Sequence, residues 1–379
     1  MQKNVVIAGY VRSPFHFSKK GHLAKVRPDE MAAQVVRGLV EKTGVNTADI
    51  EDLILGCAFP EGEQGLNMAR IVTFLAKLPI SVAGTTVNRF CGSSMQSIHM
   101  AAGAIQMNAG DAFICAGVES MSRVPMGGYN PMPHPGLATH YEQAYMAMGV
   151  TAENLAEKYN LSRQRQEELT VISHQRAGDA RQSGRLADEI IPIINGDNII
   201  SSDGCIREGT TAEALADLKP VFRAHGSVTA ATSSPLTDGA SATLVTSEEY
   251  AKAHGLPILA RIKSIAVAGC APEIMGIGPV SATMKALSRA GLSLSDIDII
   301  ELNEAFAAQA LSCVDELGVD MEKTNIDGGA LALGHPLGAT GARITGKAAA
   351  LLQREGKQFA LAAQCIGGGQ GIATILEAV

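Results

Sequence analysis

The strongest constraint on the fold is an order of elements that occurs twice in the chain. A strand-like apolar run, an amphipathic helical pattern and a second apolar run follow one another over residues 4–59, and the same order returns over 258–306. Residues 85–117 and 324–364 also parallel each other, each with a glycine-containing turn before a helix of small residues and a final apolar run. Strands that alternate with helices favour α/β layers and a mostly parallel sheet. We therefore predict two pseudo-duplicated α/β halves packed in layers.

The middle of the chain has a different character, which predicts an inserted loop domain. Residues 121–140, MSRVPMGGYNPMPHPGLATH, are rich in proline and glycine and are typical of a loop. A strongly helical stretch follows over 151–184, with Thr151 as its expected N-cap. We expect an N-terminal half over 1–120 that is completed by 228–256, an inserted covering domain over 121–227 and a C-terminal half over 257–379.

Composition excludes several classes of function. The 379 residues carry a net charge of −7 without basic clusters, which argues against nucleic-acid binding. The chain has no run of 18 apolar residues that would predict a membrane span, and its N-terminus lacks the apolar region of a signal peptide. The seven cysteines are scattered and never in C-x-x-C spacing, so we expect neither a disulfide framework nor a metal site. Thiols of this kind indicate a cytoplasmic protein.

Two turns that correspond in the duplicated order each place one reactive side chain before a helix. Cys91 lies in NRFCGSSMQSI, where the apolar spacing predicts a helix that begins near Gly92 or Ser93. The positive end of that helix favours a thiolate, so we expect the pKa of Cys91 to lie well below the value of about 8.5 for a free thiol. A buried cysteine without chemistry is the alternative. His335 lies in GGALALGHPLGATGAR, in a rigid turn that suits a general base.

Three further polar residues near these turns have competing interpretations. His99 falls on the apolar side of the helix after Cys91, which indicates a core histidine with satisfied hydrogen bonds. Asn303 and Glu304 follow the strand-like DIDIIEL. Either of them orients a water molecule or holds the histidine, or Asn303 simply caps the next helix.

Cys365 stands directly before a glycine cluster, in LAAQCIGGGQG. The cluster does not end in Gly-Lys-Ser/Thr, and too little chain follows it for the helix that a dinucleotide fingerprint must open. We expect instead a thiol beside bare backbone N–H groups, above all that of Gly367, which can approach an oxyanion. With two thiols at one site, Cys91 would carry an acyl group and Cys365 would move a proton.

Four motifs together resemble those of the thiolase family, in the same order and over essentially the whole chain: NRFCGSSMQSI, NEAFAAQA, GGALALGHPLGATGAR and CIGGGQGIA. The resemblance implies a thiolase-like fold with an inserted loop domain. It also implies thiolytic cleavage of 3-ketoacyl-CoA to acetyl-CoA and a shortened acyl-CoA in fatty acid β-oxidation. Coenzyme A is then a co-substrate, and no cofactor is tightly bound.

The resemblance implies a role for each residue that matches a motif. Cys91 is the nucleophile that accepts the acyl group, and His335 is the base that activates it. Cys365 exchanges a proton with the substrate α-carbon or with the thiol of coenzyme A. Asn303 holds a water molecule which, with His335, forms one oxyanion hole. The backbone N–H groups of Cys91 and Gly367 form the other.

The inserted region bears on the type of thiolase. Where the short-chain biosynthetic type has His-Met-Gly, this chain has Ala147 before Met148, and the loop over 121–148 is shorter, as in degradative 3-ketoacyl-CoA thiolases. The resemblance makes Met148 a substrate contact and Ser234 a contact of the pantetheine arm. The methionines of the loop either line a channel for an alkyl chain or fill space against the core; they are Met121, Met126, Met132, Met146 and Met148.

The main alternative is an acetyl-CoA acetyltransferase that acts on short chains. A non-catalytic thiolase-like lipid carrier is disfavoured because such a carrier needs no combination of Cys91, His335 and Cys365. A cysteine hydrolase is disfavoured because it needs no second thiol. The resemblance further implies a homodimer or homotetramer, and an association with a multifunctional subunit of β-oxidation.

Overall fold

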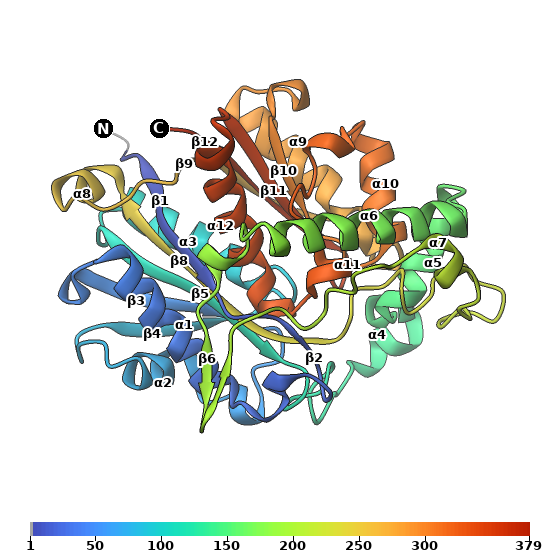
Figure 1. Ribbon diagram of the computed structural model, residues 1–379, viewed down its shortest axis with the longest axis horizontal. Helices are drawn as coiled ribbons and strands as arrows, with labels where there is room; N and C mark the ends of the chain where they lie inside the picture. Colours follow the sequence, from blue (N-terminus) through green and yellow to red (C-terminus); the bar gives the residue numbers. More distant parts are fainter. Residues whose placement is uncertain (1–2) are drawn as a thin grey trace.

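The computed structural model describes residues 3–379, and strands alternate with helices along most of this length (Figure 1). The strands are β1 (Val5–Arg12), β2 (His16–Phe17), β3 (Ile50–Gly56), β4 (Ala83–Val87), β5 (Ala112–Ser120), β6 (Ile193–Asn195), β7 (Asn198–Ile200), β8 (Thr237–Ser247), β9 (Ala260–Gly269), β10 (Ile299–Leu302), β11 (Phe359–Ile366) and β12 (Gln370–Glu377). The helices are α1 (Pro28–Thr43), α2 (Met68–Leu75), α3 (Ser93–Gln106), α4 (Pro135–His140), α5 (Met148–Lys158), α6 (Arg163–Gln182), α7 (Ala212–Ala216), α8 (Glu248–Ala253), α9 (Gly278–Ala290), α10 (Ala307–Leu317), α11 (Ala330–Leu333) and α12 (Leu337–Glu355).

Within the described residues, ten strands form one mixed sheet. Its main order is β4-β3-β5-β8-β1-β9-β12-β11-β10, and β2 pairs with β8. The pairs β3–β4, β3–β5 and β10–β11 are parallel, whereas the other neighbours in this order run antiparallel. The expectation of a mostly parallel sheet is therefore wrong. β12 follows β11 after only three residues, and a connection that short joins antiparallel neighbours.

The two halves of this sheet have the same strand order. In the first half, β1-β8-β5-β3-β4 corresponds to β9-β12-β11-β10 in the second, and an isolated parallel bridge between Ile300 and Thr324 takes the place of β4. The halves join where β1 pairs with β9 over two residue pairs. The prediction of two pseudo-duplicated α/β halves is confirmed.

Helices cover the outer faces of both halves and fill the space between them. α1 and α2 pack on the first half, and α9 and α10 pack on the second. α3 and α12 contact each other in the middle, in a core that includes strands of both halves (Figure 1). A Cβ atom at Gly341 of α12 would lie 2.3 Å from the backbone nitrogen of Met95 in α3. The absence of a side chain at Gly341 therefore lets the first turns of the two central helices touch.

α3 begins at Ser93, as the apolar spacing predicts. His99 on this helix is buried, and its Nε2 atom lies 2.8 Å from Oγ1 of Thr374 on β12. Burial lowers the pKa of His99 to about 3. The interpretation of His99 as a core histidine with a satisfied hydrogen bond is confirmed.

The inserted region contains α4 to α7 and the β6–β7 hairpin (Figure 1). Helices α5 and α6 pack against the second half, whereas the hairpin packs against α1 of the first half. The expectation that Thr151 caps a helix is wrong, because α5 begins at Met148 and Ala147 is its N-cap. Oγ1 of Thr151 donates a hydrogen bond to the carbonyl of Met148, 2.7 Å away, inside the first turn. The helical stretch is divided into α5 and α6, and Ser162 caps α6 by accepting a hydrogen bond from the backbone N–H of Arg165.

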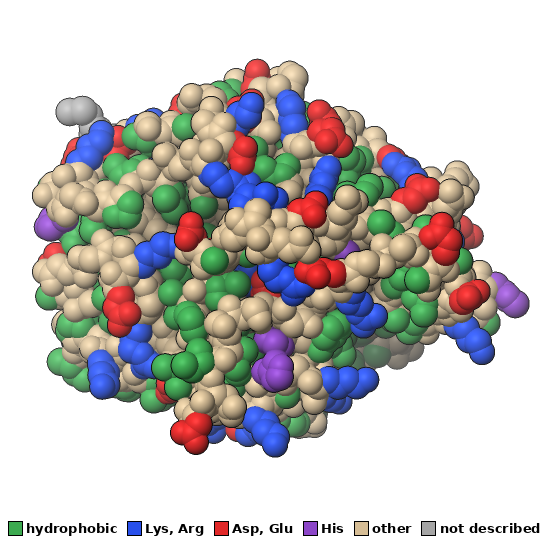
Figure 2. All heavy atoms as spheres, viewed as in Figure 1, with side chains coloured by type: hydrophobic (Ala, Val, Ile, Leu, Met, Phe, Trp, Pro, Cys, Tyr) green, Lys and Arg blue, Asp and Glu red, His purple; other side chains and the backbone are tan. Residues whose placement is uncertain are grey.

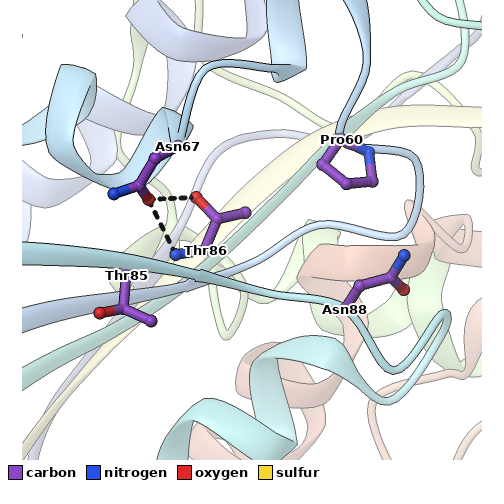
Figure 3. A pocket seen from close by; sticks show the side chains of 5 residues that line it. All are labelled: Pro60, Asn67, Thr85, Thr86 and Asn88. Carbon is purple, nitrogen blue, oxygen red and sulfur yellow. Dashed lines mark hydrogen bonds between the residues drawn. The ribbon is translucent and has the colours of Figure 1, made fainter.

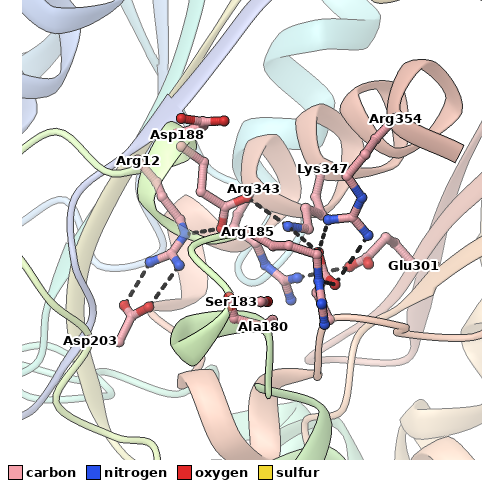
Figure 4. Close-up of polar contacts among 12 residues, drawn as sticks. Arg12, Ala180, Ser183, Arg185, Asp188, Asp203, Glu301, Arg343, Lys347 and Arg354 are labelled. Atoms are coloured by element: carbon pink, nitrogen blue, oxygen red, sulfur yellow. Dashed lines mark hydrogen bonds and ion pairs between the residues drawn. The ribbon is translucent and has the colours of Figure 1, made fainter. Parts of the chain in front are cut away.

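A buried cluster of ion pairs ties the inserted region to β1 and α12 (Figure 4). Arg12 of β1 pairs with Glu189 and Asp203, at 2.7 Å in both cases. Lys347 of α12 pairs with the same Glu189 at 2.9 Å and with Asp327 at 2.7 Å. Removal of one partner from a buried pair leaves an uncompensated charge and destabilises a protein by roughly 3–5 kcal/mol. The cluster therefore fixes the position of α12 relative to the sheet.

The outer edge of β4 is covered by the side chain of Asn67 (Figure 3). Oδ1 of Asn67 accepts hydrogen bonds from N and Oγ1 of Thr86 at 3.0 and 2.9 Å, and Nδ2 donates to the carbonyl of Gly84 at 2.8 Å. An exposed strand edge invites pairing with another chain. Asn67 occupies part of this edge, so another chain that approached it would meet the Asn67 side chain as well as the backbone of β4.

The surface carries charges of both signs. On the face drawn in Figure 2, Lys and Arg side chains are interspersed among Asp and Glu. No helix within residues 3–379 is long and apolar enough to cross a membrane. In the same range, no group of three or more His, Cys, Asp and Glu side chains is arranged to hold a metal ion. All seven cysteines are free, so each thiol is present as a separate group.

Gly341→Ala tests the contact between the central helices. The added methyl group meets the backbone of α3, so we expect the free energy of unfolding to fall by about 1–3 kcal/mol. Gly103→Ala on α3 is the matched control, because a Cβ atom there has no heavy atom within 4 Å. That control is expected to raise stability by about 0.5–1 kcal/mol. Urea unfolding followed by circular dichroism measures both, and equal stabilities of the two variants would contradict the packing argument.

Candidate active site

Three turns that are far apart in the sequence meet at one small cavity. Cys91 precedes α3, His335 precedes α12, and Cys365 lies near the end of β11. All three line a cavity of about 70 Å³. A volume of this size holds roughly two water molecules. The structure therefore brings together two thiols and one imidazole that the sequence places in separate motifs.

The Cys91 turn is held from both halves of the molecule. Cys91 is 9% exposed and packs with Ala58, Met121 and Leu337. Its carbonyl accepts a hydrogen bond from the Nε2 of Gln364, the residue before Cys365 on β11. The two thiol-bearing segments are thus linked directly through the Cys91 backbone.

The expectation that Cys91 has a lowered pKa is wrong. Burial raises the pKa of Cys91 to about 11, and the negative charge of Glu119 adds to this effect. The backbone N–H groups of Gly367 and of Cys91 itself act in the opposite direction, because they stabilise a negative sulfur. The helix end is present as predicted, but in a water-excluded site its effect is smaller than that of desolvation.

His335 is oriented by hydrogen bonds on its backbone and on its ring. Its backbone N–H donates to Oγ1 of Thr237 at 3.1 Å, and Nδ1 lies 2.7 Å from Oγ1 of Thr340 in the first turn of α12. Burial lowers the pKa of His335 to about 3, and the positive charge of Arg343 contributes. The imidazole is therefore neutral at physiological pH and has a lone pair available for a proton.

Asn303 contacts the histidine and does not cap a helix. Its Nδ2 lies 3.5 Å from both ring nitrogens of His335. The cap interpretation is wrong, because α10 begins only at Ala307 with Phe306 as its N-cap. An isolated antiparallel bridge pairs Phe306 with Ser233, so the chain is still extended there. Oδ1 of Asn303 is buried and has no hydrogen-bond partner among the described residues, so it is available to a bound molecule.

Glu304 has a structural role. Its carboxylate accepts hydrogen bonds from Oγ of Ser173 at 2.7 Å, Nδ2 of Asn325 at 2.8 Å and the backbone N–H of Leu331 at 3.1 Å. Ser173 lies on α6, in the inserted region. Glu304 therefore anchors that region to the segment that carries Asn303.

Cys365 is fully buried beside the glycine turn. Burial raises the pKa of Cys365 well above its usual value, and the proximity of Cys91 raises it further. Gly368 and Gly369, with φ of 78° and 83°, turn the chain back into β12. At Gly367, a Cβ atom would lie 3.4 Å from the sulfur of Met148, an ordinary van der Waals contact, so Gly367 lies beside a residue that lines the cavity.

Two family models together match nearly the whole chain. Residues 5–249 match the model of the thiolase N-terminal domain, and residues 256–378 match that of the thiolase C-terminal domain. The chain belongs to the thiolase family. It is 51% identical over 385 residues to a 3-ketoacyl-CoA thiolase of Shewanella loihica, with 99% of each chain covered.

Two solved structures have the same fold as this thiolase. The acetyl-CoA acetyltransferase of Bacillus anthracis superimposes with a TM-score of 0.92 at 40% identity, covering 100% of this chain and 99% of that one. Human mitochondrial 3-ketoacyl-CoA thiolase in complex with CoA gives a TM-score of 0.92 at 36% identity, covering 100% of this chain and 98% of that one.

The inserted region of the thiolase contributes apolar side chains to the lining of the cavity. Met121, Met126 and Met148 line it together with Ser234. Met132 is 83% exposed and Met146 does not line the cavity, so three of the five loop methionines line the cavity and two do not. Met275, Leu236 and Phe306 also line it, and no pattern in the sequence marks them as site residues.

Thr340 is a polar residue of the site that no motif in the sequence predicts. It lies five residues after His335, inside a helix of small residues, where nothing distinguishes it from a packing threonine. The signal in the sequence is the spacing, because a helix that starts right after His335 turns its first-turn side chains back toward that residue.

Thr340→Val tests the orientation of His335. Valine keeps the shape of threonine but cannot bond to Nδ1, so we expect acyl transfer to Cys91 to slow by about tenfold, part of the 10²–10⁴ that a positioned base supplies. Thr345→Val on the same helix is the control, since Oγ1 of Thr345 donates only to the carbonyl of Gly341. Rapid-quench mass spectrometry after addition of acyl-CoA measures the rate, and equal rates in the two variants would count against the assignment.

Proposed function

We propose that this protein is a 3-ketoacyl-CoA thiolase, an acetyl-CoA C-acyltransferase of fatty acid β-oxidation. The observation that carries the proposal is the meeting of Cys91, His335 and Cys365 at one cavity, with the backbone N–H of Gly367 directed at the Cys91 sulfur. Acyl transfer between thiols needs a nucleophile, a base and an acid for the carbon that leaves. The curated relatives that match the full chain carry the same name.

In the first half-reaction, the Cys91 thiol gives its proton to His335, and the sulfur attacks the 3-keto carbon. The resulting oxyanion, and the enolate that forms after it, are stabilised by preorganised donors. We assign one oxyanion hole to the N–H groups of Cys91 and Gly367, and the other to His335 with a water molecule on Asn303. The bond between C2 and C3 then breaks. Its electron pair remains on C2 as the enolate of acetyl-CoA, which takes a proton from Cys365.

In the second half-reaction, the Cys365 thiolate removes the proton from the thiol of coenzyme A. The new thiolate attacks the thioester carbonyl on Cys91 and forms the shortened acyl-CoA. The Cys91 sulfur leaves and recovers its proton from His335. Because the resting thiols and imidazole are all neutral, each proton moves only when substrate is present to accept the charge.

Coenzyme A is the co-substrate in this proposal, with Ser234 as a contact of its pantetheine arm and Met148 as a contact of the bound substrate. Both residues line the cavity, and the backbone N–H of Ser234 donates to the carbonyl of Ala305 at 3.0 Å, which fixes the loop beside the Asn303 segment. The human relative of known structure is described in complex with CoA. Seven free thiols suit a reducing compartment, and we propose the cytoplasm.

A second candidate is an acetyl-CoA acetyltransferase that acts on short chains. The cavity of about 70 Å³ favours a short acyl group, and one structural relative carries that name. The two activities differ in how the rate depends on chain length. Thiolysis of 3-ketoacyl-CoA from four to sixteen carbons separates them, because complete loss of activity beyond acetoacetyl-CoA would favour the acetyltransferase.

Two variants test the roles of the thiols. Cys91→Ser should form no acyl-enzyme, so intact mass after addition of acyl-CoA shows no adduct. Cys365→Ser should still form the adduct but turn over at least about 10²-fold more slowly, because its hydroxyl is a poor acid and base at neutral pH. Normal turnover of Cys365→Ser, or an adduct on Cys91→Ser, would be incompatible with the mechanism.

We propose that the protein forms a homodimer through the side of the first half that carries β4. Leu66 and Ile80 there are 90% and 76% exposed, and Phe74 and Phe90 are also exposed. Four of the eight non-glycine residues with positive φ in the described chain lie between positions 66 and 90. Strained backbone and exposed apolar side chains together indicate a surface that another protein chain covers. Phe90 directly precedes Cys91, so this contact would also support the nucleophile turn. Assembly into a homotetramer and association with a multifunctional β-oxidation subunit stay predictions.

Ile80→Asp tests this surface. A charge in an apolar interface is expected to shift the protein toward monomer by at least about tenfold in the dissociation constant, corresponding to about 1.4 kcal/mol. Ile199→Asp on the β6–β7 hairpin is the control, because Ile199 is 70% exposed elsewhere. Analytical ultracentrifugation of both variants gives the result, and a dimer of Ile80→Asp as stable as wild type would place the interface elsewhere.

A further inference from the structure

The duplicated halves place a second set of side chains at the positions that correspond to the catalytic ones. β3 pairs with β5 through Gly56 and Gly117, and β10 pairs with β11 through Leu302 and Ala363, so the residues that follow are equivalent. The equivalent pairs are Cys57 with Asn303, Cys91 with His335, and Glu119 with Cys365. Cys91 is used in the mechanism, but Cys57 and Glu119 are not.

Glu119 is fully buried, and its carboxylate accepts hydrogen bonds from several donors. The donors are the backbone N–H groups of Ala58 at 2.8 Å, Phe59 at 3.2 Å and Gly338 at 3.0 Å, Nε2 of Gln64 at 2.9 Å and Sγ of Cys57 at 3.6 Å. A carboxylate that only accepts hydrogen bonds is suited to this set, because every partner is a donor. Glu119 is therefore a satisfied buried carboxylate.

These donors belong to the segments that surround the nucleophile Cys91 and the base His335. Ala58 and Phe59 lie in the cluster that packs around Cys91. Gly338 lies in the first turn of α12, three residues after His335, where a negative charge is favourable to the helix. A Cβ atom at Gly338 would lie 2.9 Å from Oε2 of Glu119, so only glycine allows this approach.

We propose that Glu119 is a positioning residue: it fixes the Cys91 and His335 turns relative to each other, and it places a buried negative charge beside the Cys91 turn. This inference rests on the acyl-transfer function proposed above, in which Cys91 is the nucleophile. Glu119 contacts neither the sulfur nor the substrate. It acts through its hydrogen bonds to backbone N–H groups and through the electrostatic field of its charge. A thiol held in this way resists alkylation and oxidation between turnovers, since the thiolate is the reactive form.

The charge on Glu119 is one of several groups that face Cys91. The titratable side chains around Cys91 are Glu119 and Cys57 from the first half, and His335 and Cys365 from the second. Of these, Glu119 is the charged group that raises the pKa of Cys91, in addition to burial. Arg343 acts on His335 instead. Removal of the charge from Glu119 is therefore expected to lower the pKa of Cys91.

The experiment measures alkylation of Cys91 in the full-length protein by iodoacetamide between pH 7 and 9, with peptide mass spectrometry to separate Cys91 from the other thiols. Glu119→Gln removes the charge, so the pKa of Cys91 falls and alkylation becomes several-fold faster at each pH. Glu119→Asp keeps the charge but is too short to reach all donors. Its alkylation rate is expected to stay within about twofold of wild type, while kcat for thiolysis falls.

Glu304→Gln is the matched control, since Glu304 is a buried carboxylate with three donors and is not among the groups that shift the pKa of Cys91. Its Cys91 alkylation rate is expected to equal that of wild type. Equal alkylation rates in Glu119→Gln and Glu119→Asp would overturn the electrostatic role. If Glu119→Gln does not fold, a wild-type kcat for Glu119→Asp overturns the positioning role. Alkylation does not require turnover, so the alkylation rates are independent of whether the substrate assignment is correct, whereas the kcat of Glu119→Asp depends on it.

Discussion

The contact between α3 and α12 is the constraint on which the site depends. Each helix begins immediately after a turn that carries a reactive residue, and the two first turns touch because Gly341 leaves no side chain between them. A hydrogen bond from the backbone N–H of Ala342 to Oγ of Ser94, at 2.8 Å, fixes their register. The distance between nucleophile and base is thus set by helix packing, which is stiffer than any loop.

The same packing explains why the resting groups are neutral. A site between two central helices excludes water, and desolvation disfavours both the thiolate and the imidazolium. The pKa of Cys91 rises to about 11 and that of His335 falls to about 3, so a preformed ion pair is unfavourable. The backbone N–H groups near the sulfur remain without side-chain competitors. They are worth most when negative charge develops on the substrate, because they are already oriented and pay no reorganisation at that moment.

Sequence reasoning succeeds where a signal is local or repeated. The turns of Cys91, His335 and Cys365 carry glycine, proline and helix-start patterns, and the duplication relates the first two. It fails where pairing between segments that are distant in the sequence decides the local structure. The directions of β8 and β12 depend on which strands they join, and Asn303 is not a cap because the following residues pair with 232–234 before the helix begins. Met275 lies far from the motifs in the sequence, and only the tertiary fold brings it to the cavity. The motif around Cys91 does not indicate how deeply its side chain is buried.

Duplication also accounts for the asymmetry of the site. Each half has the same three positions for site residues, at two strand ends and one helix start. If all six positions held reactive groups, several titratable side chains would share one small cavity. The first half keeps one reactive thiol, and its two other positions hold Cys57 and Glu119, which bond to each other and to the backbone. The second half keeps Asn303, His335 and Cys365. One half therefore supplies the nucleophile and a rigid frame, and the other supplies the groups that move protons.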